Sequence, residues 1–141
     1  MENKKLVALS LFLDAEKDEI TEVDESTFKY AQAEYKVLTD DEADEAAKEY
    51  IKESLWAFNT SFISSHCKVS LSVHAEKALQ KMQGELCDDA NELVACLIED
   101  MDEFISDAIN ADGRGHFVSS YDGEENEQEV EGETLYIYRT N

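Results

Sequence analysis

The pattern of apolar residues predicts two short strands in the first third of the chain. Residues 5–13 (KLVALSLFL) form a short β-rich apolar run, which is consistent with a buried strand. Residues 34–38 favour a second strand because Tyr35 and Val37 alternate with polar positions. A helical spacing also fits part of residues 28–38, but a clear helix start follows immediately.

A helix is predicted from Thr39 to about Phe58. Thr39 and Glu42 have the spacing of a capping box, and the acids between them suit the positive end of a helix dipole. The apolar positions that follow have helical spacing: Ala47, Ile51, Leu55 and Phe58.

Beyond an irregular stretch at 59–72, the sequence predicts two further helices and two strands. Residues 73–86 have moderate helical character, and residues 88–111 give the strongest helix, which Gly113 ends. Its apolar stripe is Leu93, Leu97, Met101, Phe104 and Ala108. Strands are predicted at 116–121 (HFVSSY) and 134–139 (TLYIYR), with an acidic, glycine-punctuated connection between them.

These elements predict one α+β domain over residues 1–141. Three or four helices would pack on a small antiparallel sheet formed by the N-terminal strand and the C-terminal hairpin. An apolar content of 43% suffices for a compact core. No segment reaches the roughly 20 apolar residues of a membrane helix. Residues 5–13 are too short for a signal peptide, and Asp14 follows at once. The chain has an odd number of cysteines, Cys67, Cys87 and Cys96, and no CxxC pair, which fits a reducing compartment such as the cytoplasm.

Charge changes this picture more than any motif does. The chain has 34 acidic and 12 basic residues, a formal net charge of −22. Nucleic acid and anionic membranes would be repelled, so the expected partner is a basic protein surface. Adaptation to high salt is an alternative reason for such acidity.

The acids are also unevenly placed. Ten acids and no base lie between Lys81 and Arg114, and seven more acids without a base lie between Gly115 and Tyr138. On the helix after Thr39, four acids recur every four residues, which stacks their carboxylates at steps of about 6 Å: Asp41, Glu45, Glu49 and Glu53. We interpret this row as an imitation of a phosphate backbone, and the alternative is an ordinary solvated helix face that Lys48 and Lys52 partly neutralise.

Candidate chemistry is weak by comparison, so we predict no enzyme, no cofactor and no metal site. The segment from Asn110 fails the calcium-loop pattern, because its twelfth position is Tyr121 instead of glutamate. The cysteines and histidines lack the ligand spacing of a zinc site. The junction residues could form a small enzymatic or ligand-binding site, with His116 as a general base between carboxylates: Arg114, His116, Tyr121 and Asp122.

Three segments resemble small uncharacterised proteins encoded by bacteriophages. They are YKVLTDDEADEAAKEYIKESLWAF (35–58), ADGRGHFVSSYDGEENE (111–127) and YIYRTN (136–141). In those proteins, stretches such as YxVLTDxEAD, DGRGHFxSxYDGEENE and YYIYRxN recur around a variable middle. The resemblance implies a phage accessory protein made in the bacterial cytoplasm, and it assigns no role to any residue.

Charge and resemblance together predict an anti-defence protein. It would mimic nucleic acid and inhibit a host nucleic-acid-binding protein of restriction or CRISPR type. The predicted partner-binding acids are Asp41, Glu45, Glu49, Glu53, Glu92, Glu99, Asp100, Glu103 and Asp107. The alternatives are a phage interaction or scaffold protein whose acidity serves only solubility, and the module around His116.

Overall fold

The computed structural model describes residues 3–141 and divides the chain into two compact units. Among the described residues, the first unit combines residues 3–47 with 112–141, and the second spans residues 48–111. Helix α2 (Asp40–Glu53) begins in the first unit and ends in the second, and the same boundary falls within the last turn of α6 (Met101–Asp112).

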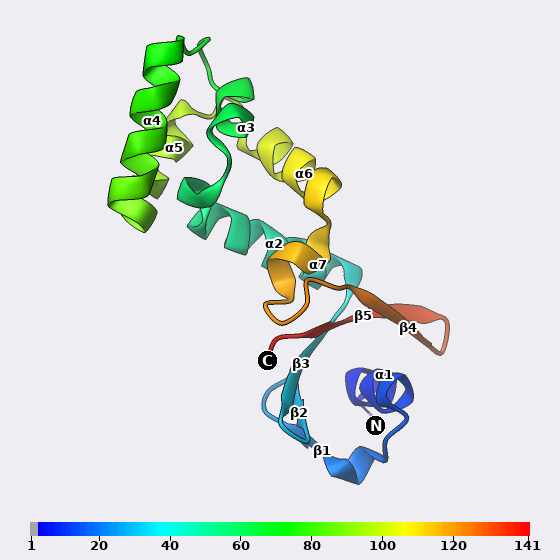
Figure 1. Cartoon of the computed structure of the whole chain (residues 1–141). Helices are drawn as coiled ribbons and strands as arrows, with labels where there is room; N and C mark the ends of the chain where they lie inside the picture. Colours follow the sequence, from blue (N-terminus) through cyan, green and yellow to red (C-terminus); the bar gives the residue numbers. More distant parts are fainter. Residues whose placement is uncertain (1–2) are drawn as a thin grey trace. The chain divides into compact units, whose positions relative to one another are not determined.

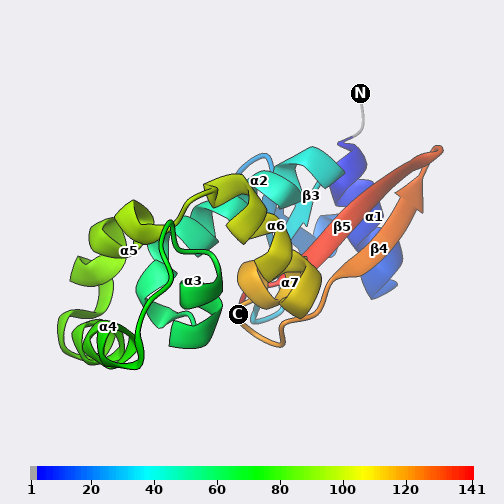
Figure 2. The same ribbon diagram turned by 90° about the horizontal axis from the view of Figure 1, so that it is seen from above.

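The first unit is built on an antiparallel sheet, so the predicted α+β class is confirmed. Its strands are β1 (Ile20–Glu22), β2 (Thr27–Tyr30), β3 (Ala33–Leu38), β4 (Asn126–Val130) and β5 (Glu133–Arg139). They lie in the order β1-β2-β3-β5-β4, and every neighbouring pair is antiparallel. The C-terminal hairpin of β4 and β5 stands out in Figure 2. The predicted strands at 34–38 and 134–139 correspond to β3 and β5.

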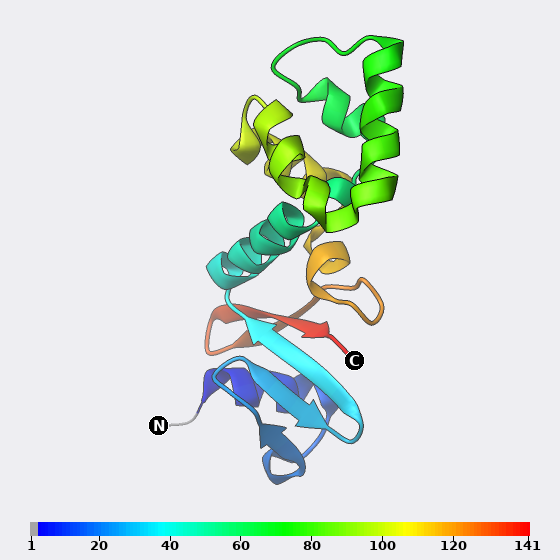
Figure 3. The ribbon, with the colours of Figure 1, turned by 90° about the vertical axis from the view of Figure 1, so that its left-hand side faces the viewer.

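The predicted N-terminal strand is wrong, because residues 4–13 form the helix α1 (Lys4–Leu13). A short unbroken apolar run fits a buried helix as well as a strand. The residues at the two ends of the run favour the helix. The side chain of Asn3 accepts a hydrogen bond from the amide of Lys5, and Asp14 ends the helix in the left-handed conformation with a φ of 52°. Helix α1 lies across one face of the sheet (Figures 1 and 3), where Ala8 and Leu9 are fully buried.

The predicted strand at 116–121 is also wrong, since residues 116–118 belong to the helix α7 (Arg114–Val118) and residues 119–121 form a turn without strand pairing. The first strand of the hairpin lies instead in the acidic stretch that we expected to be a connection. Its alternation is hidden in the sequence because two half-buried positions, Asn126 and Gln128, are polar. A two-residue turn with positive φ at Glu131 and Gly132 joins β4 to β5, which suits the twist of a hairpin.

The second unit is helical. It contains α3 (Thr60–Ser65), α4 (Val73–Leu86), α5 (Asn91–Leu97) and most of α6, with short 3₁₀ turns at Leu55–Ala57 and Cys87–Ala90. The predicted helix at 73–86 is confirmed as α4. The helix predicted to reach Phe58 ends at Glu53, and the segment predicted as irregular contains α3.

The single helix predicted over 88–111 is wrong, because the chain leaves the helical conformation at Ile98, where ψ is 127°. Backbone hydrogen bonds with residues 66 and 68, which are remote in sequence, stabilise this break between the helices. The amide of Glu99 donates to the carbonyl of His66 at 2.9 Å, and the amide of Lys68 donates to the carbonyl of Leu97 at 2.9 Å. No apolar periodicity could reveal two backbone hydrogen bonds of this kind.

The aromatic core of the second unit gathers around Phe104, which is fully buried. The rings of Phe58, Phe62 and His66 have their centroids 5.1, 4.9 and 5.2 Å from that of Phe104. All three contacts are tilted edge to face, the arrangement that aromatic pairs prefer. No helix within residues 3–141 is long and apolar enough to cross a membrane.

Gly115 permits the closest backbone approach in the first unit. A Cβ atom there would lie 2.5 Å from the carbonyl oxygen of Gly123 and 2.8 Å from the amide nitrogen of Glu125. Because backbone atoms cannot step aside, we expect Gly115→Ala to lower the free energy of unfolding by about 1–3 kcal/mol. Gly84→Ala is the matched control, since Gly84 is helical and has nothing within 4 Å of that position. The control should stabilise by about 0.5–1 kcal/mol in urea unfolding.

The ion pair between Lys5 and Glu42 makes stability depend on pH. Lys5 Nζ lies 2.7 Å from Glu42 Oε1, and the bond from Lys5, followed by the amide of Thr39, lowers the pKa of Glu42 below its usual 4.5. The contribution is therefore present above that pH and is lost as the pH falls through the folded pKa.

The variant Glu42→Gln keeps the capping box but loses the charge. We expect it to be less stable at neutral pH by at most about 1 kcal/mol, because Glu42 is largely exposed. Thermal unfolding from neutral to acidic pH should show the two curves converging below pH 4.5. A constant difference across that range would exclude this linkage.

Candidate acidic binding surface

Helix α2 carries four rows of side chains at i, i+4 spacing. Three of these rows have residues that pack in the core, cap the helix or form ion pairs within the protein. One row is apolar and fully buried: Ala43, Ala47 and Ile51. The second row begins with Glu42, which completes the predicted capping box: the amide of Thr39 donates to Glu42 Oε1 at 2.9 Å, and the amide of Glu42 donates to Thr39 Oγ1 at 3.2 Å. These two rows fix the start and the buried face of the helix.

The third row holds the acids that bind Arg114. Nη1 of Arg114 lies 2.7 Å from Asp40 Oδ1 and 3.0 Å from Asp44 Oδ1, and it also donates to the carbonyl of Asp40 at 3.1 Å. One turn further on, this row continues with Lys48, whose Nζ lies 3.9 Å from Asp102 Oδ1. The charges of this row are therefore compensated within the protein.

The fourth row is the predicted one, and we call it the α2 carboxylate row. Its members are Asp41, Glu45, Glu49 and Glu53. All four are exposed, and no side-chain hydrogen bond or ion pair ties them to any of residues 3–141. The structure thus places these four acids on one helix face, as the sequence predicted, and none of their carboxylates forms an ion pair with a cation among residues 3–141, although Lys48 and Lys52 lie on the adjacent row.

Arg114 has a largely buried side chain in the first unit. Its side chain is only 11% exposed, and its Nε donates to Glu125 Oε1 at 2.8 Å. The guanidinium also lies over the ring of Tyr136, 4.5 Å from the centroid. Burial opposes the charge, but the hydrogen bonds that Arg114 donates to Glu125, Asp40 and Asp44 outweigh it and raise the pKa of Arg114 above its ordinary value.

Tyr138 extends this cluster into the core. Its hydroxyl donates to Glu125, and burial, followed by this carboxylate, raises the pKa of Tyr138 above its usual value. The phenol therefore stays protonated and acts as a donor to an acid that Arg114 also holds. The cluster joins α2, α7, β5 and the start of β4, so its role is structural.

The second predicted group of acids is divided among several elements. Glu92 lies on α5, Glu99 and Asp100 lie in the break between helices, and Glu103 and Asp107 lie on α6. Because 88–111 is not one helix, these acids form no single stripe.

Two of these acids also have local structural roles. Asp100 Oδ1 accepts from the amide of Glu103 at 3.1 Å and so caps α6, and Asp107 Oδ2 lies 3.2 Å from His66 Nε2. Glu103 occupies the first turn of α6, where an acid suits the helix dipole. Asp112, by contrast, lies at the C-terminal end of α6, where the helix dipole disfavours an acid.

The predicted junction residues do not converge on one site. Arg114 points into the carboxylate cluster, and Asp122 accepts from Ser119 Oγ at 2.8 Å and from the amide of Glu124 at 3.0 Å. The ring of Tyr121 lies under the guanidinium of Arg139, 3.7 Å away, while His116 is exposed with its ring edge-on to Phe117. Each side chain has a different partner, so this arrangement gives no support to a general base at His116.

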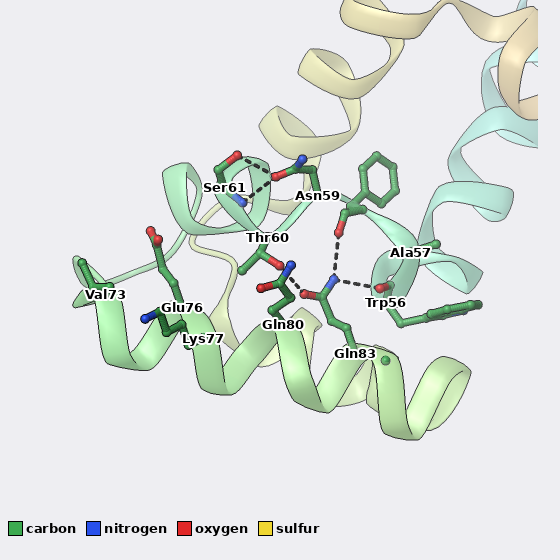
Figure 4. Close-up of a pocket in the computed structure, with 12 residues that line it drawn as sticks. Trp56, Ala57, Asn59, Thr60, Ser61, Val73, Glu76, Lys77, Gln80 and Gln83 are labelled. Carbon is green, nitrogen blue, oxygen red and sulfur yellow. Dashed lines mark hydrogen bonds between the residues drawn. The ribbon is translucent and has the colours of Figure 1, made fainter.

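One hollow of about 600 Å³ lies in the second unit between the 55–61 segment and α4 (Figure 4). Gln83 forms its floor. The Gln83 side-chain amide donates to the carbonyls of Trp56 and Phe58 at 2.7 and 2.8 Å, and its oxygen accepts from Thr60 Oγ1 at 2.8 Å. Because every polar atom of this buried amide is used, Gln83 holds the wall together and is not free to bind a ligand.

A second hollow, of about 610 Å³, has a different lining. It is bordered by Ser65, His66 and residues 99–103, where acids predominate. The side chain of His66 is only 11% exposed. The approach of His66 to α6 could not be predicted from the sequence, because residues 66 and 107 are far apart along the chain. The three cysteines are free.

No protein-family model, curated protein or solved structure matches this chain.

Removal of Arg114 should be among the most damaging single changes in the first unit. Arg114→Met would leave three carboxylates facing one another, so we expect a loss of about 3 kcal/mol in the free energy of unfolding at neutral pH. Part of this loss should be regained on acidification, because protonation of the carboxylates relieves their repulsion. Arg139→Met is the matched control: it removes a surface cation over Tyr121 and should cost about 1 kcal/mol or less in the same denaturant titration.

Proposed function

We propose that this protein is a non-catalytic acidic decoy that binds a basic, nucleic-acid-binding protein surface through the α2 carboxylate row. The observation that carries the proposal is the contrast between the four rows of α2. One row packs in the core, the second contains the acid that binds Lys5, and the third contains the acids that bind Arg114. The fourth row holds four exposed acids that form no ion pair with any of residues 3–141.

Repulsion within such a row has an energetic cost. Like charges at i, i+4 destabilise a helix by a few tenths of a kcal/mol per pair, and the row contains three such pairs. A helix that only needed solubility would gain from lysines at alternate positions of the same row. The uncompensated row therefore favours a role in binding, with opposite charges supplied by a partner.

The spacing of the carboxylates along α2 determines how closely the row can resemble a nucleic-acid backbone. The carboxylates repeat at about 6 Å along the helix and span about 18 Å. Phosphates of one DNA strand repeat at about 3.4 Å along the duplex axis. The row thus has roughly half the axial charge density of one strand, so it would resemble nucleic acid in sign and direction more than in atomic detail. Association should consequently be fast and strongly sensitive to salt.

The class of target follows from the resemblance to bacteriophage accessory proteins. A phage protein of this kind would act in the cytoplasm of a bacterial host, and restriction or CRISPR nucleases carry the basic grooves that the row would fit. Glu92 and Glu99, both exposed, could extend the contact on the second unit. Asp100 and Asp107 support it less, because they already cap α6 and pair with His66.

The direct test compares two variants of equal charge. In the first, the α2 carboxylate row is neutralised by Asp41→Asn, Glu45→Gln, Glu49→Gln and Glu53→Gln. In the second, four exposed acids elsewhere are neutralised: Glu22, Glu124, Glu127 and Glu129, each changed to Gln. Both variants have a formal charge of −18 instead of −22.

Tagged wild-type protein is first used to capture partners from bacterial lysate at low and high salt, with DNA as competitor. We expect a nucleic-acid-binding partner that DNA displaces. The row variant should bind this partner at least 30-fold more weakly, which corresponds to about 2 kcal/mol. The control variant should bind within about threefold of wild type, because it changes only the net charge.

Two results would contradict the proposal. If both variants lost affinity equally, total charge and not the row would govern binding. If the captured partner were indifferent to DNA and to salt, the protein would be an interaction or scaffold protein whose acidity serves solubility.

A further inference from the structure

The contact between α3 and α6 in the second unit brings together three side chains of a metal-ligating kind. Glu103 and Asp107 are four residues apart on α6, so they lie on the same face of the helix. His66 follows the last residue of α3. The hydrogen bond from the amide of Glu99 to the carbonyl of His66 fixes this histidine beside the start of α6.

The ring of His66 is held in place before any ligand binds. It packs against Phe62 and Phe104, with centroids 5.0 and 5.2 Å away, and its side chain is 11% exposed. Its Nε2 points toward α6 and lies 3.2 Å from Asp107 Oδ2. One donor is therefore rigid and set against apolar rings, while Glu103 is exposed and Asp107 is about half-exposed.

The donor atoms of the three residues all lie within 4.8 Å of one another. Ligands on a zinc ion lie about 2.0–2.2 Å from the metal, which puts neighbouring donors a little over 3 Å apart. The pair of His66 and Asp107 already has that separation. Rotation of the exposed Glu103 side chain would bring in the third donor without any movement of the backbone.

We propose that His66, Glu103 and Asp107 form a binding site for a divalent transition-metal ion of the Zn²⁺ type. The imidazole nitrogen favours zinc over Mg²⁺ and Ca²⁺, which prefer oxygen ligands alone. The hollow lined by His66 and residues 99–103 lies against the same donors and leaves room for water or for a donor atom of another molecule to complete the coordination. This inference is independent of the proposed decoy function.

The other acidic cluster of similar geometry has a different explanation. Asp40, Asp41 and Asp44 also lie within 4.8 Å of one another, but they contain no histidine, and two of them bind Arg114. A cation there would compete with the guanidinium. The site at His66 differs in two ways. It has a nitrogen donor beside two carboxylates, and within residues 3–141 no basic side chain contacts Glu103.

The test is isothermal titration of the full chain with ZnCl₂. Cys87→Ser and Cys96→Ser are introduced first, because these exposed thiols could bind zinc themselves. We expect one saturable site that an excess of MgCl₂ does not remove. His66→Gln, Asp107→Asn and Glu103→Gln should each weaken zinc binding at least 10-fold, and circular dichroism checks that each variant is folded.

Glu92→Gln is the matched control for Glu103→Gln, since it removes one exposed acid from the same unit, and it should leave zinc affinity within about twofold of wild type. The proposal is overturned if zinc binds weakly at many sites and Mg²⁺ displaces it. It is also overturned if Cys67→Ser abolishes binding while His66→Gln has no effect, because the neighbouring thiol would then be the ligand. Unchanged zinc affinity in folded Asp107→Asn and Glu103→Gln would also overturn it, because the contact between His66 and Asp107 would then have no part in metal binding.

Discussion

The first unit depends on the ion pairs that the guanidinium of Arg114 forms with three carboxylates. The guanidinium binds acids of α2 and the half-buried Glu125 at the same time, and it lies over Tyr136 of β5. Buried charge is tolerated only when it is paired and hydrogen-bonded, and Arg114 meets both conditions. Gly115 lets α7 pack directly on the backbone of residues 123–125. This packing places the preceding residue, Arg114, where the acids converge.

The same cation determines what α2 can offer to a partner. By compensating Asp40 and Asp44, it makes the first turn of the helix compatible with a dense set of acids. The adjacent α2 carboxylate row remains exposed and uncompensated. A chain with a formal charge of −22 must manage self-repulsion, and here the acids that cap or pair are distinct from the acids that face solvent in this row. That division of roles, more than the net charge, gives the decoy proposal its physical basis.

Sequence reasoning succeeded where local rules decide the structure. The capping box at Thr39, the strands β3 and β5 and the helix α4 each follow from nearby residues, and so does the row of acids along α2. It failed where remote contacts decide. The apolar run at 5–13 could be either element, the break at Ile98 depends on hydrogen bonds to residues 66–68, and β4 carries polar residues on its half-buried positions. The proposed metal ligands were missed for the same reason, since only the folded chain brings His66 to α6.

Contact between a partner and the α2 carboxylate row can be observed by NMR. Amide chemical shifts of the isotope-labelled protein are compared with and without its captured partner. We expect the largest shift changes along the exposed face of residues 41–53, and we expect them to diminish as salt is added. Changes confined to the hollow lined by Trp56 and Gln83, with α2 unaffected, would contradict the proposed contact.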